Sequence, residues 1–361
     1  MREEDRQRRV KGRGAVSNPG GRFEANHLEA ADDGWGSLDE PLPDPATVLL
    51  ADRPRRAITR NTSPDVPFEQ SINPYQGCEH GCIYCFARPS HAYWNLGAGL
   101  DFETRIFHKP GLERLLAREL AAPGYACRPI NLGANTDPYQ PAERERRTTR
   151  ALLEVLLAHR HPVTIVTKGV LVLRDLDLLA ALAARRLCSV AVSLTTLDDD
   201  LKRTLEPRAA APRARLQVIR RLVGAGVPVT VLLAPMIPAL NDHEMESLLD
   251  AAAAAGAANA AFMMLRLPHD LGRLFEEWLR EHYPQRADRV LNLLREARGG
   301  RLNDPRFGHR MRGEGAYAAL LSARFAAACR RNGLNAARSP ELDCSQFVHD
   351  PAAPRQGDFF G

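Results

Sequence analysis

Three of the seven cysteines lie within eight residues, in the run Cys78-Glu79-His80-Gly81-Cys82-Ile83-Tyr84-Cys85. Three thiolates this close on one loop can ligate three irons of a [4Fe-4S] cubane and leave the fourth iron open to another ligand. A zinc ion would need a fourth protein ligand, such as His80 or a distant cysteine, and structural zinc sites usually contain paired Cys-x2-Cys knuckles. The sequence has no second knuckle. The spacing therefore favours the cluster and leaves zinc as the alternative.

Other polar motifs follow short apolar or β-branched runs along the chain. The runs are residues 71–75, 129–134, 163–166, 189–194, 227–233 and 260–265, and we interpret them as six strands. The cysteines follow the first of them. The motifs at the ends of the other five are Asn135-Thr136-Asp137, Thr167-Lys168, Ser193-Leu194-Thr195-Thr196, Ala234-Pro235-Met236 and Arg266-Leu267-Pro268.

The segments between these strands carry apolar residues at three-to-four spacing, as at Leu152, Val155 and Leu156, which predicts amphipathic helices. Strict alternation of strands and helices predicts a parallel sheet with right-handed crossovers. The predicted fold is α/β, a partial (β/α)6 TIM-like barrel rather than a complete eight-stranded one. Active sites in such folds are built at the carboxyl ends of the strands, so the motifs are expected to share one site.

We predict three regions along the chain. Residues 1–66 are rich in Gly, Pro, Asp and Arg without sustained periodicity, which indicates an extended or partly disordered N-terminal segment. Residues 67–270 contain the partial barrel. Residues 271–361 show helical patterns followed by a Pro-rich tail, which predicts a C-terminal cap.

Composition narrows the class of protein only partly. The chain has 361 residues and a net charge of +5, and nearly all of its positive charge is arginine, a residue suited to bidentate phosphate contacts. The same richness in Ala and Arg is also typical of a GC-biased genome. The charged N-terminus is unlike a signal peptide, and the longest apolar stretch, 251–265, is too short and weak to span a bilayer. We therefore expect a cytoplasmic protein without a membrane anchor.

Several motifs together resemble one known family. The Cys-x3-Cys-x2-Cys spacing is the signature of the radical S-adenosylmethionine (SAM) superfamily, and the chain is similar to it over roughly residues 67–270. Within that superfamily the chain resembles the spore photoproduct lyase-related branch, often labelled DNA repair photolyase. The motifs that carry this resemblance are Asn73-Pro74-Tyr75-Gln76-Gly77-Cys78, Asn135-Thr136-Asp137-Pro138-Tyr139-Gln140-Pro141, Thr167-Lys168-Gly169, Leu205-Glu206-Pro207-Arg208 and Ala234-Pro235-Met236-Ile237-Pro238.

The resemblance implies a SAM enzyme. The cluster would cleave SAM reductively to a 5′-deoxyadenosyl radical, and an external one-electron reductant of the flavodoxin or ferredoxin type would supply the electron. It also implies residue roles: Asn135, Thr136 and Asp137 at the amino group of SAM, Lys168 and Arg208 at its carboxylate with Ser193 in support, and Tyr84 at the adenine. Simpler roles remain open, because Asp137 before Pro138 can open a turn, Lys168 and Arg208 can cap or be solvated, and Tyr84 can belong to the core.

The chain departs from spore photoproduct lyase at one position of consequence. That enzyme has a hydrogen-donating cysteine just upstream of its second-strand Thr/Ser-Asp element, whereas residues 132–137 here contain no cysteine. Cys127 precedes the strand, at the wrong end of the barrel. We therefore expect an activity other than thymine-dimer lyase, on a substrate that the sequence does not name. A nucleic acid base is one candidate, with Tyr75, Tyr93, Trp94 and Tyr139 able to stack on bases or simply to pack the barrel mouth.

A second class of function stays open. The chain could be a non-catalytic iron-sulfur or zinc protein that acts as a redox sensor or binding module on the same scaffold. Asp137, Lys168 and Arg208 argue against it, because a sensor needs no site for a zwitterion. Separately, the tail Gln356-Gly357-Asp358-Phe359-Phe360 loosely resembles peptides that dock on bacterial sliding clamps, although Gly357 departs from that pattern.

Overall fold

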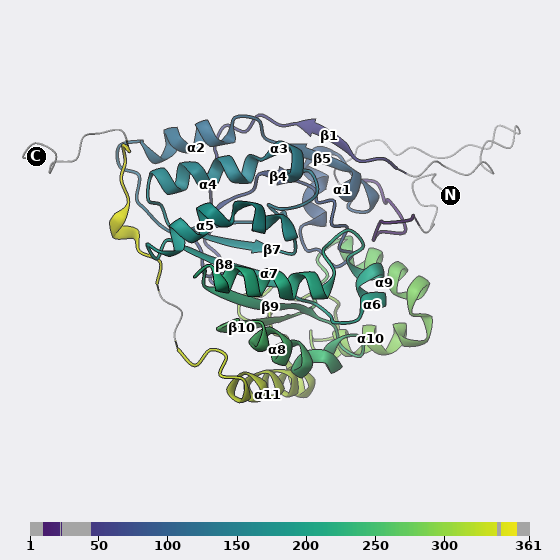
Figure 1. The fold of residues 1–361 in the computed structure, drawn as a ribbon. Coiled ribbons are helices and arrows are strands. Elements are labelled where there is room, and N and C mark those ends of the chain that lie inside the picture. Colours follow the sequence, from purple (N-terminus) through teal and green to yellow (C-terminus); the bar gives the residue numbers. More distant parts are fainter. Residues whose placement is uncertain (1–9, 22, 24–44, 338–340, 352–361) are drawn as a thin grey trace, which may run out of the picture.

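The computed structural model describes residues 10–21, 23, 45–337 and 341–351. A seven-stranded sheet forms its centre, in the order β10-β9-β8-β7-β6-β3-β2 (Figure 1). The strands from β3 to β10 in this order are parallel to their neighbours, and β2 joins β3 antiparallel. Their bounds are β2 Thr59–Arg60, β3 Gln70–Ile72, β6 Ile130–Leu132, β7 Val163–Thr167, β8 Cys188–Ser193, β9 Val229–Met236 and β10 Asn259–Met264.

Each of the six predicted strands overlaps one of these parallel strands, and the α/β class is confirmed. Buried and half-buried residues alternate along β7 and most of β9, as the two faces of a pleated strand require. The edge strands β2 and β10 do not pair with each other, so the sheet is open. No closed barrel forms among the described residues, and the predicted partial barrel stays a prediction.

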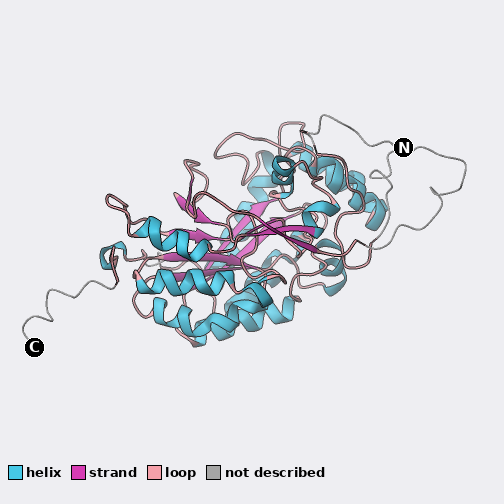
Figure 2. Ribbon diagram, turned by 90° about the horizontal axis from the view of Figure 1, so that it is seen from above, coloured by secondary structure: helices cyan, strands magenta, loops and turns pink. Residues whose placement is uncertain are grey.

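Helices connect the parallel strands and cover one face of the sheet (Figures 1 and 2). Their leucines and valines form one large apolar core with the strands. The crossover helices, with the short helices that accompany them, are α3 Glu143–Arg146, α4 Thr148–Ala158, η3 Val170–Asp175, α5 Leu176–Ala183, α6 Asp199–Leu205, α7 Pro212–Gly224, η4 Asp242–Glu244 and α8 Met245–Ala254.

A smaller three-stranded sheet lies in the N-terminal part of the chain. It has the order β1-β5-β4, with β1 parallel and β4 antiparallel to β5. Its strand β1 and the edge strand β2 come from the segment predicted to be extended, so part of that segment packs on the body. The elements here are β1 Val48–Ala51, β4 Tyr75–Gln76, η2 Arg88–Trp94, α1 Leu100–Thr104, β5 Arg105–His108 and α2 Leu112–Leu120.

The C-terminal helices are α9 Leu271–His282, α10 Pro284–Glu296 and α11 Gly315–Arg331, followed by η5 Cys344–Gln346. Helices α9 and α10 share an apolar core with Cys82, Ile83 and Tyr84, while α11 packs on α8. These helices therefore support the cysteine loop directly. The division of the chain at residues 66 and 270 stays a prediction.

In the part of the chain that the structure describes, no helix combines the length and apolarity needed to cross a membrane. The tail 356–360, with its predicted clamp-binding peptide, lies outside the described residues.

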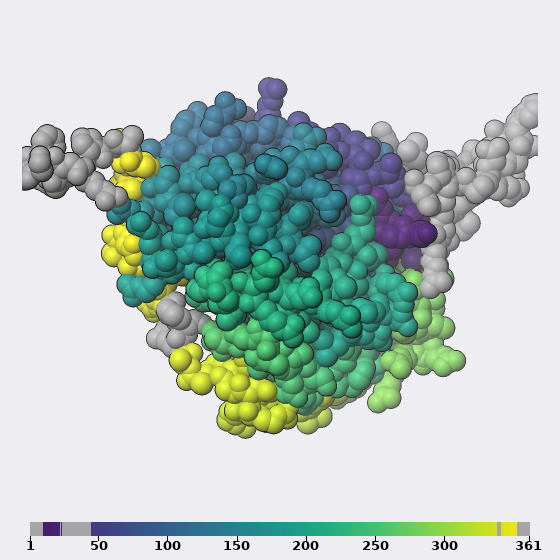
Figure 3. All heavy atoms as spheres, in the orientation of Figure 1, coloured from purple at the N-terminus to yellow at the C-terminus, as the bar shows by residue number. Residues whose placement is uncertain are grey.

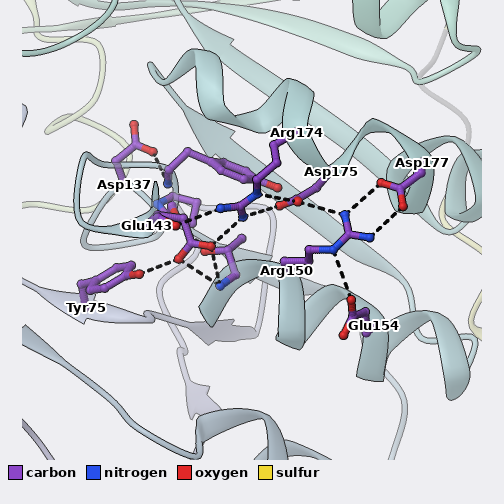
Figure 4. A network of polar contacts seen from close by, with 11 residues as sticks. Tyr75, Asp137, Glu143, Arg150, Glu154, Arg174, Asp175 and Asp177 are labelled. Atoms are coloured by element: carbon purple, nitrogen blue, oxygen red, sulfur yellow. Dashed lines mark hydrogen bonds and ion pairs between the residues drawn. The ribbon is translucent and has the colours of Figure 1, made fainter. Parts of the chain in front are cut away.

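A buried ion network holds the loop between β6 and α4 in place (Figure 4). The fully buried Glu143 carboxylate accepts hydrogen bonds from the Tyr75 hydroxyl at 2.5 Å and from the Arg174 guanidinium at 2.7 Å. Arg174 also donates to the buried Asp175 at 2.8 Å. Because Glu143 follows the Asn-Thr-Asp motif closely and Tyr75 precedes the cysteines, this network ties the two loops together.

Replacing Arg174 by leucine should lower the free energy of unfolding by about 3 kcal/mol, because Glu143 loses its salt-bridge partner and Asp175 keeps only the more distant Arg150. Urea unfolding followed by circular dichroism measures this change. Arg280→Leu is the matched control, since Arg280 pairs with Glu276 on the exposed surface of α9 and its loss should leave the midpoint almost unchanged. Equal midpoints for the two variants would contradict the role given to the network.

Candidate active site

The three clustered cysteines lie on a loop between β4 and η2. Gly77 and Gly81 have φ angles of +79° and +68°, which L-residues rarely adopt, and they bend the chain on both sides of Cys78. The amide of Cys78 donates to Phe102 O at 2.9 Å, and that of Ile83 donates to Leu205 O at 3.1 Å. The loop is thus fixed at both ends by backbone hydrogen bonds.

The Arg88 side chain supports the cysteine loop and is completely buried. Its guanidinium donates to Cys82 O at 2.9 Å and to Gly81 O at 3.1 Å. The same side chain pairs with buried Glu103 at 2.5 Å. Arg88 therefore fixes the backbone that carries Cys82.

The cysteines face a cavity of about 960 Å³, a volume that includes solvent at its open side. Nine of the ten predicted site residues line it. They are Cys78, Cys82, Tyr84, Cys85, Asn135, Thr136, Asp137, Lys168 and Ser193. Residues from the ends of β6, β7, β8, β9 and β10 thus meet the cysteine loop at one site, as the rim position of their motifs predicted.

Asp137 is the most heavily bonded acid in this cavity. Its carboxylate accepts from the Lys168 amide and the Thr167 hydroxyl, both at 2.7 Å, and lies 3.2 Å from Nδ1 of His80. Burial opposes its ionisation, but His80 and these hydrogen bonds outweigh burial and lower the pKa of Asp137 to about 2. Asp137 is therefore a carboxylate that joins the cysteine loop to the end of β7.

Among the described residues, the Lys168 ammonium is one of two cationic groups that line the cavity, the other being Arg266. The ammonium has no hydrogen-bond partner in this part of the chain, and its Nζ lies 5.7 Å from the centroid of the Tyr84 ring. Burial disfavours its charge, but Cys82 and then Glu206 reverse this effect and raise the pKa of Lys168 above its ordinary value. A charged ammonium pointing into a cavity is suited to a carboxylate ligand.

The remaining predicted residues on the lining have weaker contacts. Ser193 Oγ lies 3.3 Å from Ala234 O, Thr136 Oγ1 donates to Tyr75 O at 3.1 Å, and Asn135 Nδ2 lies 3.3 Å from both Gln76 Oε1 and Ser90 Oγ. The Tyr84 hydroxyl donates to the buried Glu206 carboxylate. Glu206 is also bonded to Thr195 at 2.8 Å and paired with Arg215, so the Tyr84 ring is held from its far end.

Arg208 is not among the residues that line the cavity. Its guanidinium lies 3.3 Å from Glu79, and its amide donates to His80 O at 3.2 Å. Arg208 thus contacts the back of the cysteine loop, and its predicted role at the SAM carboxylate has no geometric support.

The cavity also contains residues to which the sequence assigned no role at SAM. His80 and Thr167 bond Asp137, while Phe86, Met263, Met264, Arg266 and Met311 form part of the wall. The sequence contained a signal for two of these residues. Phe86 directly follows Cys85, and Arg266 directly follows the sixth predicted strand. Met311 comes from a loop after α10 and gave no such signal.

The thiols and His80 do not form a compact set of ligands among the described residues. A tetrahedral zinc with Zn–S bonds of 2.3 Å brings its sulfur ligands within about 3.8 Å of one another. Among the described residues, three ligand atoms from these cysteines and His80 do not all lie within 4.8 Å of one another. Each thiol nevertheless faces the same cavity, which fits a larger cubane whose irons are ligated at separate corners.

Comparison with known proteins assigns the family. The family model described as the radical SAM superfamily matches residues 72–252, half of the chain. The chain belongs to the radical SAM superfamily. It is therefore an enzyme of SAM-dependent radical chemistry whose reaction is unassigned.

Two relatives show how far the likeness of this radical SAM enzyme extends along the chain. An uncharacterized protein of Mycobacterium tuberculosis is 38% identical over 232 residues, which cover 64% of this chain and 68% of the relative. An uncharacterized protein of Methanocaldococcus jannaschii is 29% identical over 175 residues, or 48% of this chain and 62% of the relative.

Solved structures of spore photoproduct lyase share the fold of this radical SAM enzyme. One mutant structure has a TM-score of 0.59 at 17% identity, covering 79% of this chain and 80% of that one. The complex of spore photoproduct lyase with dinucleoside spore photoproduct has a TM-score of 0.58 at 16% identity, with the same coverage. At such identity the likeness establishes the fold alone.

An N-terminal strap, residues 10–21, covers the outer side of the cysteine loop in this radical SAM enzyme. The amides of Gly14 and Ala15 donate to the two carboxylate oxygens of Glu103 at 2.9 and 2.8 Å. Further along, Ser17 Oγ donates to Glu277 of α9 at 2.5 Å. In Figure 3 this purple segment lies between the indigo residues that follow residue 44 and the light green C-terminal helices. The strap thus closes the side of the loop that faces away from the cavity.

Gly14→Ala tests whether the strap protects the loop. A Cβ on Gly14 would overlap the carbonyl oxygen of Gly81, so the strap of this variant cannot seat on the loop. After anaerobic loading with iron and sulfide, we expect at least a several-fold faster loss of visible cluster absorption in air than for the unaltered protein. Gly224→Ala is the control, because nothing lies within 4 Å of a Cβ at that position. Equal decay rates for both variants would show that the strap does not shield the loop.

Proposed function

We propose that this enzyme holds a [4Fe-4S] cluster on Cys78, Cys82 and Cys85 and cleaves SAM to a 5′-deoxyadenosyl radical that acts on a substrate bound in the same cavity. The observation that carries this proposal is the convergence of the three cysteines, ionised Asp137 and the free ammonium of Lys168 on one cavity. The open sheet, with the site at the carboxyl ends of its strands, supports a partial barrel as its architecture.

The chain's own residues give each part of SAM a matching environment. The Lys168 ammonium suits the carboxylate, with Ser193 beside it, and the negative charge of Asp137 with Asn135 and Thr136 suits the amino group. Tyr84, with its hydroxyl held by Glu206, offers an aromatic ring to the adenine. Asp137 has a second task, because its bonds to His80 and to the Lys168 amide fix both loops in one geometry.

When bound and reduced, the cluster would supply the electron that breaks a carbon-sulfur bond of SAM. The protein's part is to orient the cofactor and keep water from the radical. The Met263, Met264 and Met311 side chains and Leu232 line much of the cavity and provide this apolar shielding. An external one-electron reductant, of flavodoxin or ferredoxin type, supplies the electron in this proposal.

The cavity argues against a thiol hydrogen donor. Among the described residues, the cysteines that line it are the three of the predicted cluster, and residues 132–137, the stretch that corresponds to the donor-cysteine region of spore photoproduct lyase, contain no cysteine. Cys127 lies before β6, at the opposite end of the strand, and is in contact with Cys344. We therefore propose a reaction other than thymine-dimer cleavage, carried out in the cytoplasm, with a nucleic acid base as one candidate substrate.

The non-catalytic alternative, an iron-sulfur or zinc protein on the same scaffold, has less support. A binding module would not need a free lysine and an ionised aspartate beside the cysteines. A single zinc would require a tighter set of ligands than the described residues provide.

The first test uses Cys82→Ala. After anaerobic loading and reduction with dithionite, the unaltered protein should hold about four irons per chain and form 5′-deoxyadenosine from SAM, because three thiolates suffice for the cubane. Cys82→Ala should lose both properties. Cys188→Ala is the matched control, since Cys188 is buried in β8 at the far end of the sheet. Zinc in place of iron, or a loaded cluster that forms no 5′-deoxyadenosine, would favour the non-catalytic alternative.

A second test addresses Lys168. Lys168→Met keeps the length and apolar stem of the side chain but removes its charge, so the affinity for SAM should fall about ten- to a hundredfold. Equilibrium dialysis of the cluster-loaded protein measures this change. Lys202→Met is the control, because Lys202 donates to Pro207 O away from the cavity. Unchanged affinity in Lys168→Met would remove Lys168 from the SAM site.

A further inference from the structure

Arg266 stands at the end of β10, where the cavity meets solvent. Its backbone position is fixed by Arg298, which donates to Met264 O at 3.1 Å and to Leu265 O at 2.6 Å. Its guanidinium lies over the ring of Phe86, with 4.7 Å between Cζ and the ring centroid. Phe86 follows Cys85 directly and is 43% exposed, so this stacked pair forms the edge of the cavity next to the cysteine loop.

The donors of Arg266 are unused by the protein. The other buried arginines near the site are fully engaged, since Arg88, Arg215 and Arg298 each bond carbonyl or carboxylate oxygens. Within the described residues, the Arg266 guanidinium has no hydrogen bond and no ion pair. Its nitrogens are not among the buried atoms without a partner, so they are accessible to solvent, and Arg266 is one of the residues that line the cavity. A guanidinium offers five N–H donors, all available here to a ligand.

The charge of Arg266 is also left without a close counterion. The charged or titratable groups that influence it are Arg310, Asp65 and Cys85. Asp65 is already paired with Arg310 and accepts from the Gly308 amide at 2.7 Å. Burial and then Arg310 lower the pKa of Arg266 from its ordinary value, although a guanidinium remains protonated at neutral pH. The local field therefore favours an anion.

We propose that Arg266 and Phe86 form an anion subsite that holds a phosphate of a nucleotide substrate beside the radical-generating site. A guanidinium fork matches two phosphate oxygens, which gives the contact both strength and direction. The exposed face of Phe86 and the neighbouring Met263 and Met311 side chains suit a planar ring. An oxyanion next to a stacked ring is the pattern of a nucleotide, either free or within a nucleic acid strand. The proposal rests on the proposed function for the chemistry that follows binding.

Binding can be measured without turnover. The cluster-loaded protein with SAM is titrated anaerobically into a fluorescein-labelled single-stranded DNA of about 12 nucleotides, and anisotropy is followed at several salt concentrations. Arg266→Ala should raise the Kd about ten- to a hundredfold. It should also flatten the slope of log Kd against log salt by about 0.7, the value for one lost phosphate contact on a single strand. Phe86→Leu should weaken binding with an unchanged slope.

Controls and competitors decide the assignment. Arg306→Ala removes a surface arginine already paired with Asp304 and Glu314, and should leave Kd and slope unchanged. Competition by thymidine monophosphate as strong as by unlabelled DNA would identify a free nucleotide as the ligand, and weaker competition would identify a strand. Equal competition by an acidic peptide, or wild-type Kd and slope in Arg266→Ala, would overturn the proposal.

The outcomes also separate this proposal from the proposed function. A protein that cleaves SAM but binds neither DNA nor nucleotide would disprove the subsite alone. Arg266-dependent binding by a protein that forms no 5′-deoxyadenosine would disprove the radical chemistry alone. If Arg266→Ala instead weakened SAM binding or cluster loading while DNA binding persisted, Arg266 would serve the cofactor and the subsite would be rejected.

Discussion

The buried ion pair of Arg88 and Glu103 is the constraint on which the cysteine loop depends. Both side chains are inaccessible to solvent, so neither can be left without its partner at low cost. Other N–H groups of Arg88 donate hydrogen bonds to carbonyl oxygens of the loop, and the Glu103 carboxylate accepts hydrogen bonds from amides of the strap. One pair thus connects three segments that lie far apart in the chain.

This arrangement has a chemical consequence for the thiols. Burial raises the pKa of Cys82 to about 12, and also raises that of Cys78, so these groups are protonated as long as no cation compensates them. A metal centre that binds thiolates would therefore displace protons as it binds. The rigid loop keeps the sulfurs facing the cavity in the meantime, because Arg88 and the backbone bonds, rather than the metal, hold its conformation.

Much of the site could be predicted because it follows two local rules. Short β-branched runs marked all six parallel strands, and the carboxyl ends of parallel strands meet at one edge, so Asp137, Lys168 and Ser193 had to lie near the cysteines. Arg208 is the predicted site residue that does not line the cavity. It follows helix α6 rather than a strand, and the pairing of strands does not determine the direction of a loop that follows a helix. The strap was also not predicted. It binds Glu103 through backbone amides, and such contacts require no particular side chains that a sequence pattern could reveal.

Among the described residues, the carboxylate and the cations that line the cavity are Asp137, Lys168 and Arg266. Asp137 is bonded to His80, to the Thr167 hydroxyl and to the Lys168 amide, while the Lys168 ammonium lies beside the Tyr84 ring. Arg266 stands free at the outer edge, stacked on the residue that follows Cys85. Within the described part of the chain, the Lys168 ammonium and the Arg266 guanidinium have no hydrogen bond or ion pair, and SAM has a single carboxylate. Since the proposed function places that carboxylate at Lys168, Arg266 remains for the second molecule that a radical enzyme must hold.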